Sequence, residues 1–118
     1  MKNAGFGRPE RLTRNVDYRK VKERGVSYSD GLFFVARLKN DLGRHRLGMA
    51  IGSSKIPYAC RRNRVRRLIR EYFRQNKKKM GGIYYDMVIG VRKPMGREIS
   101  YGFIENRLTS LLKRAKIS

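Results

Sequence analysis

The chain has 118 residues and is strongly basic, with 30 lysines and arginines, 9 acidic residues and a formal net charge of +21. Such a charge destabilises a compact domain by self-repulsion and is typical of proteins whose partner is a polyanion, above all nucleic acid. No apolar run approaches the roughly 20 residues that cross a bilayer, the first residues show no secretion signal, and the single cysteine excludes an internal disulfide, so a cytoplasmic protein without a membrane partner is expected.

The N-terminal part predicts a basic arm followed by one helix. Residues 1–11 contain two glycines and a proline and predict a flexible basic arm, which leaves residues 12–118 as a single domain. A first helix is expected from about Val16 to Arg24. Asn15 is a plausible N-cap for it, and Gly25 is suited to the position after its last turn.

Two β-strands are expected next. LFFVARLK has apolar residues on both faces, RLGMAIG follows a turn over residues 40–43, and the pair is most simply a hairpin. In the second strand, Gly48 and Ala50 share a face that is too small to fill a core. This face predicts the floor of a furrow that a ligand can enter. His45, beside the turn, is expected to be exposed to solvent.

The stretch from Pro57 to Lys79 predicts a long amphipathic helix with ten basic residues and one acidic residue, Glu71. Its apolar residues follow helical spacing: Val65, Leu68, Ile69, Tyr72 and Phe73. One row of cations is expected along an edge of this stripe: Arg62, Arg66 and Arg70. Other polar residues point away from the core: Asn63, Arg67 and Arg74. One face therefore anchors the helix, and the cations in two directions suit a polyanion.

A third clear strand is expected in IYYDMVIGVRK, which ends before Pro94. A last helix begins near Ser100 and has apolar residues at helical spacing: Phe103, Ile104, Leu108, Leu111, Leu112 and Ala115. The order α-β-β-α-β-α predicts a small α/β layer structure.

The sequence offers little for bond-breaking chemistry. One histidine and one cysteine supply neither a metal site nor a nucleophile with its base, and no phosphate-binding glycine loop precedes a helix. Binding chemistry remains, because arginine pairs with phosphate and aromatic rings stack on unpaired bases. Tyr18, Phe34 and Tyr84 are candidates for stacking if they face the furrow, and at most one of Phe33 and Phe34 is expected in a ligand site.

The run RNRVRRLIRE, from Arg62 to Glu71, resembles the signature of the protein subunit of bacterial ribonuclease P. RLTRNVDYRKVKERG resembles that family's first helix, RLGMAIG its second strand and VIGVRKP its late strand, so the likeness covers about residues 8–115. It implies a small α/β sandwich with one mixed sheet of about four strands and a left-handed βαβ crossover, against the usual preference. It also implies an RNA-binding subunit that assists a catalytic RNA in endonucleolytic removal of the 5′ leader from precursor tRNA.

Carried over by position, the resemblance implies roles for two groups of residues. The first would contact the RNA subunit: Arg62, Asn63, Arg64 and Arg67. The second would surround a cleft for the single-stranded leader, between the first helix and the open face of the sheet: Tyr18, Lys22, Phe34, Ala36, Arg66 and Arg70. Lys22 and Ala36 stand where aromatic residues occur in other members, so leader binding should rely more on charge.

The remaining implications concern partners and chemistry. The expected partners are ribonuclease P RNA and the precursor tRNA leader, with no small-molecule substrate and no catalytic residue on the protein. Magnesium is expected on the RNA. A structural rRNA-binding protein of the ribosome would share the charge and the basic helix, and remains the alternative.

Overall fold

The computed structural model of the chain describes residues 10–80, 82–94 and 99–117. Its elements in chain order are α1 (Asn15–Arg24), β1 (Val26–Ser29), β2 (Phe33–Lys39), β3 (Arg46–Ala50), α2 (Ala59–Asn76), the 3₁₀ turn η2 (Lys77–Lys79), β4 (Tyr85–Val91) and α3 (Tyr101–Arg114).

The arm predicted over residues 1–11 lies mostly outside the described residues, which begin at Glu10. Arg11 forms a parallel bridge with Leu47, and the N–H of Leu12 donates to the Leu47 carbonyl oxygen at 2.9 Å. The chain is therefore attached to the edge of the sheet before α1 begins.

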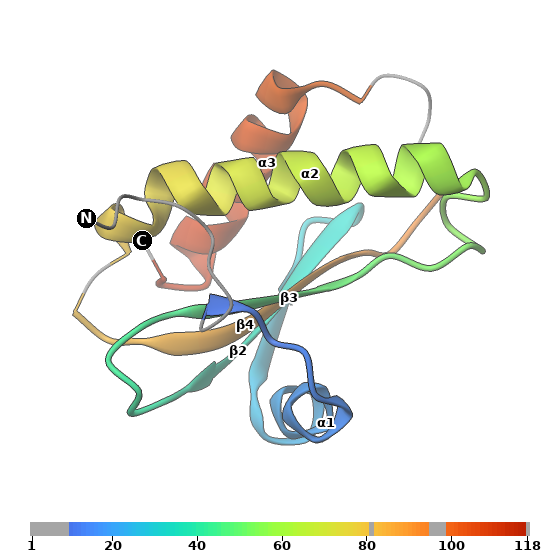
Figure 1. Ribbon diagram of the computed structural model, residues 1–118. Helices are drawn as coiled ribbons and strands as arrows, with labels where there is room; N and C mark the ends of the chain where they lie inside the picture. The colour runs from blue at the N-terminus through green and yellow to red at the C-terminus, as the bar shows by residue number, and fades with distance from the viewer. Residues whose placement is uncertain (1–9, 81, 95–98, 118) are drawn as a thin grey trace, which may run out of the picture.

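The four strands form one mixed sheet in the order β1-β2-β4-β3 (Figure 1). β2 is antiparallel to both β1 and β4, whereas β3 is parallel to β4. The predicted hairpin of β2 and β3 is therefore wrong, and the hairpin in the structure joins β1 to β2. All seven residues of β4 are buried, so this apolar strand takes a central position between β2 and β3.

The sheet has helices on both faces, so the predicted α/β sandwich is confirmed. α2 and α3 pack on one face and α1 on the other (Figure 1). The larger core lies under α2 and α3 and includes Phe33, Ile69 and Leu108, all at 0% exposure. A smaller cluster under α1 contains Val21 and Val88 among others. α2 is the crossover between the parallel strands β3 and β4; the left hand expected for it stays a prediction.

The amphipathic helices agree with the sequence patterns, with small differences at their ends. In α2 the predicted apolar residues are buried except Leu68, which is half-buried. α3 begins after Ser100, whose Oγ accepts a hydrogen bond from the N–H of Phe103 at 3.2 Å. Asn15 is the first residue of α1 and not its N-cap; Arg14 takes that position without a side-chain hydrogen bond.

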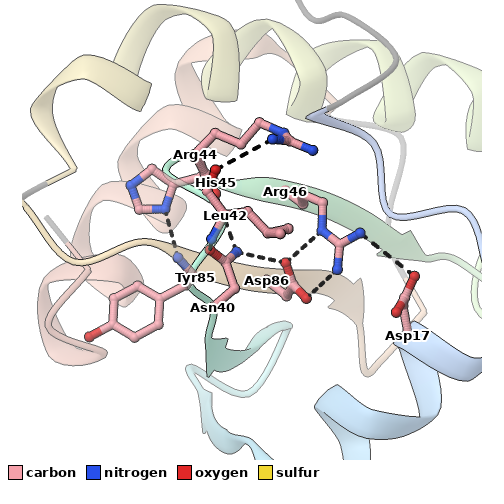
Figure 2. A network of polar contacts seen from close by, with 8 residues as sticks. All are labelled: Asp17, Asn40, Leu42, Arg44, His45, Arg46, Tyr85 and Asp86. Atoms are coloured by element: carbon pink, nitrogen blue, oxygen red, sulfur yellow. Dashed lines mark hydrogen bonds and ion pairs between the residues drawn. The ribbon is translucent and has the colours of Figure 1, made fainter.

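His45 is buried, with 5% exposure, and the expectation of a solvated turn residue is wrong. Its Nε2 lies 3.0 Å from the Met80 carbonyl oxygen. Its Nδ1 accepts a hydrogen bond from the N–H of Tyr85 at 3.1 Å (Figure 2). These partners fit a neutral imidazole that carries its hydrogen on Nε2. The ring thus joins the end of the α2 segment to the start of β4.

Candidate nucleic-acid interface

On the α1 side of the sheet, two aromatic rings lie against glycines of the strands, Phe34 of β2 and Tyr18 of α1. Phe34 and Ala50 flank Gly90 in one row across β2, β4 and β3. A Cβ on Gly90 would lie 2.5 Å from Cζ of Phe34, and one on Gly48 would lie 2.7 Å from Cζ of Tyr18. Only glycine allows the rings to approach the backbone so closely. The floor predicted from Gly48 and Ala50 is therefore divided: the Tyr18 ring covers Gly48, whereas Ala50 is exposed and lines a cavity.

Gly90→Ala should lower the free energy of unfolding by about 1–3 kcal/mol, the usual cost of overpacking. The added methyl group would meet the Phe34 ring and also the Ala50 carbonyl oxygen, at 2.6 Å, so the ring and β3 must both move. Gly82→Ala is the matched control, because nothing lies within 4 Å of a Cβ there. Urea denaturation measures both, and equal stabilities of the two variants would contradict this packing.

The larger cavity on this face has a volume of about 760 Å³ and lies between α1 and the sheet. Four residues predicted for the leader cleft line it together: Tyr18, Lys22, Phe34 and Ala36. The structure adds three cations that were not assigned to the cleft from the sequence: Arg19, Lys55 and Arg92. Arg92 lies in the VIGVRKP run, so its position directly after a strand was the available signal.

A second cavity of about 350 Å³ lies along the edge strand β3 and is lined by Arg66 and Arg70 of α2. Tyr18 lines both cavities, so the six predicted leader-cleft residues surround two adjoining hollows. The Tyr18 hydroxyl accepts a hydrogen bond from the N–H of Met49 at 3.1 Å, which fixes the ring at their boundary. Tyr84 lines neither cavity, and Phe33 is a core residue.

The four residues predicted to contact the RNA subunit divide into two pairs. Arg62 Nη1 donates to the carbonyl oxygens of residues 56 and 57 at 2.8 and 2.9 Å, and Arg64 Nε donates to the Ile99 carbonyl oxygen at 3.1 Å. These two arginines hold loops against the start of α2. Asn63 and Arg67 are exposed. Of the predicted row of cations Arg62, Arg66 and Arg70, Arg62 therefore binds a loop, and only Arg66 and Arg70 line the β3 cavity.

The only acidic residue of α2, Glu71, is bound by its own neighbours. Hydrogen bonds from Arg74 first, and from Gln75 second, lower the pKa of Glu71 to about 2. The Arg74 Nε donates to Glu71 at 3.0 Å. At neutral pH this carboxylate is therefore ionised and paired with Arg74. Because its charge is offset by Arg74, the potential around Arg66 and Arg70 stays positive.

Arg46 is held in a structural network beside the cleft (Figure 2). Its Nε and Nη2 donate to the two carboxylate oxygens of Asp86 at 2.8 and 2.6 Å, and Asp17 of α1 lies 3.7 Å from its Nη1. Asn40 donates to the same Asp86 at 2.8 Å. The hydrogen bond with Asp86 raises the pKa of Arg46. This arginine therefore joins α1 to β3 and β4.

Residues 10–80, 82–94 and 99–117 contain neither a candidate metal site nor a helix that could span a membrane. No three His, Cys, Asp or Glu side chains gather there in a way that could hold a metal ion. No helix in this part of the chain is long and apolar enough to cross a membrane.

The family model and the similar sequences all point to the same family. The family model described as Ribonuclease P matches residues 6–116. The ribonuclease P protein component of Pelotomaculum thermopropionicum is 43% identical over 107 residues, which cover 91% of this chain and 93% of that protein. The protein component of Clostridium botulinum strain Loch Maree is 36% identical and covers 91% of this chain and 95% of its own.

Solved structures share the fold. The RNase P protein of Staphylococcus aureus matches with a TM-score of 0.80 and 28% identity, over 92% of this chain and 96% of that one. The RNase P protein of Thermotoga maritima gives 0.78 and 30%, over 89% and 96%. Sequence and fold therefore agree, and the chain belongs to the ribonuclease P protein family.

Proposed function

We propose that the chain is the RNA-binding subunit of ribonuclease P, which assists the catalytic RNA in removing the 5′ leader from precursor tRNA. The observation that carries this proposal is the pair of adjoining cavities around Tyr18, which combine exposed cations with two aromatic rings. Family membership supplies the enzyme in which this surface acts.

The cavities suit single-stranded RNA. Phe34 and Tyr18 are half-buried, and stacking of a base on such a ring contributes about 1–3 kcal/mol. Seven cations line the two cavities and can neutralise the phosphates between stacked bases: Arg11, Arg19, Lys22, Lys55, Arg66, Arg70 and Arg92. A duplex hides its base faces, so rings at the floor of a cleft favour an unpaired leader over the mature acceptor stem.

The protein's part in this proposal is positioning and charge neutralisation in the cytoplasm, and the chemistry belongs to the RNA. Asp86 and Asp17 already bind a cation of the protein itself, Arg46. We therefore place the magnesium ions of the reaction on the RNA partner. Co-sedimentation with ribosomal subunits, and not with a free catalytic RNA, would instead favour a ribosomal role.

Arg67→Ala tests the docking surface on α2. This exposed guanidinium is expected to pair with a phosphate of the catalytic RNA, so its loss should weaken assembly about tenfold, or ~1.4 kcal/mol. Filter binding of the catalytic RNA measures the affinity, with Arg24→Ala, an exposed arginine of α1 outside both cavities, as the matched control.

Salt dependence gives the second readout of the same experiment. For the unsubstituted protein, log K should fall by roughly 0.7–0.9 per neutralised phosphate for each unit of log salt. Equal affinities of the Arg67→Ala and Arg24→Ala variants would remove Arg67 from the RNA interface. An affinity that hardly changes between low and moderate salt would contradict the electrostatic account as a whole.

A further inference from the structure

A third cavity, a pocket with a basic lining, lies at the C-terminal end of α2, apart from the two adjoining cavities of the proposed leader cleft. It has a volume of about 300 Å³, and the residues that matter for its chemistry are Arg44, His45, Lys77, Lys78 and Tyr84. None of them lines either cavity of the cleft. Lys78 follows Asn63 by fifteen positions along α2 and η2, which corresponds to a rise of roughly 23 Å at about 1.5 Å per α-helical and about 2.0 Å per 3₁₀ residue.

Tyr84 gives this pocket a positioned aromatic ring. The side chain is 37% exposed, and its ring meets the buried His45 ring edge-on, with centroids 5.2 Å apart at 60°. His45 is itself fixed by hydrogen bonds at both ring nitrogens, to Met80 and Tyr85. The Tyr84 carbonyl oxygen also accepts a hydrogen bond from the N–H of Asn40 at 2.9 Å. The ring is therefore held in place while part of it stays open to solvent.

The cations of the pocket lie on two preorganised segments. Arg44 is exposed on the loop between β2 and β3, which Asn40 braces by donating to the Arg44 carbonyl oxygen at 3.2 Å and accepting from Leu42 at 3.0 Å (Figure 2). Lys78 is exposed on η2. Glu10, the acidic residue of the pocket, lies 2.5 Å from Lys77, so the pocket keeps an excess of positive charge.

We propose that this pocket binds one unpaired nucleotide of RNA, with its base against Tyr84 and its phosphate between Arg44 and Lys78. An aromatic ring beside two cations matches the two faces of a nucleotide, one planar and one anionic. The pocket lies at the lower end of the size range of small-ligand sites, which fits one nucleotide and not a duplex. The inference rests on the proposed RNA-binding function and gives the protein a second point of attachment to RNA.

The test uses Lys78→Ala and Tyr84→Leu in the full-length protein, with Tyr84→Phe to keep the ring and Lys113→Ala, an exposed lysine of α3, as the charge control. In one arm the probe is the catalytic RNA alone. In the other arm it is precursor tRNA added to the assembled holoenzyme. A loss in the first arm assigns the nucleotide to the catalytic RNA, and a loss in the second arm assigns it to precursor tRNA.

We expect Lys78→Ala and Tyr84→Leu each to weaken binding about fivefold or more in one arm, while Tyr84→Phe and Lys113→Ala stay within twofold. Lys78→Ala should also reduce the slope of log K against log salt by about 0.7–0.9. Lys78 is exposed, so its variant remains informative if Tyr84→Leu folds poorly. Binding within twofold of the unsubstituted protein in both arms, for Lys78→Ala and Tyr84→Leu, would overturn the proposal. Failure of the unsubstituted protein to bind either RNA would instead refute the proposed function.

Discussion

Asp86→Ala should lower the free energy of unfolding by about 3–5 kcal/mol, because it removes one partner of a buried ion pair. The Asp86 side chain is 9% exposed and that of Arg46 is 20% exposed, so water cannot fully replace the lost carboxylate. Asn40 would lose the same acceptor. Urea denaturation followed by circular dichroism measures the change.

Two control variants separate the buried pair from its surroundings. Asp86→Asn keeps a carbonyl oxygen for Asn40 and should be less destabilising than Asp86→Ala. Asp17→Ala removes only the longer contact of 3.7 Å to Arg46 and should cost about 1 kcal/mol or less. If Asp86→Ala is no more destabilising than Asp17→Ala, the pair is not the main link between β3 and β4 at this point.

The double variant Arg66→Ala, Arg70→Ala should weaken binding of precursor tRNA by the holoenzyme about 10–50-fold, while binding of mature tRNA changes little. Arg66 and Arg70 line the cavity along β3, which adjoins the larger cavity at Tyr18. The leader is proposed to run through both cavities. Each lost charge-assisted contact is worth about 1 kcal/mol or more, and 1.4 kcal/mol corresponds to a tenfold change.

The comparison is made with saturating protein, so that any defect in assembly with the catalytic RNA does not enter the dissociation constants. Arg67→Ala, which is expected to act on assembly, should bind both tRNA forms normally under these conditions. An equal loss for precursor and mature tRNA in the double variant would remove Arg66 and Arg70 from the leader site.

Much of the local structure could be predicted from the sequence, because it depends on local periodicity. The spacing of Val65, Ile69 and Phe73 predicted the buried face of α2, and Ser100 marked the start of α3. Phe33 lies in the core and Phe34 lines the larger cavity; that at most one of the two rings lies in a ligand site stays a prediction. Residue chemistry and helical spacing singled out Tyr18, Phe34, Arg66 and Arg70, whereas Lys22 and Ala36 came from the family resemblance alone.

The strand order could not be predicted in this way, because pairing is decided by contacts distant in sequence. Arg46 and Asp86 are register partners on parallel strands forty residues apart, which no local pattern shows. Nothing in the sequence therefore indicated that Asp86 would be paired. The burial of His45 was missed for the same reason, because its partners Met80 and Tyr85 come from another part of the chain. β1 was missed because it has only four residues, two of them serine.

The most direct measurement is cleavage of precursor tRNA by a bacterial ribonuclease P RNA at low magnesium, with and without this protein. The account predicts that the protein restores accurate 5′ maturation and cleaves nothing when the RNA is left out. Binding to the RNA without any change in cleavage would contradict the account, as would cleavage by the protein alone.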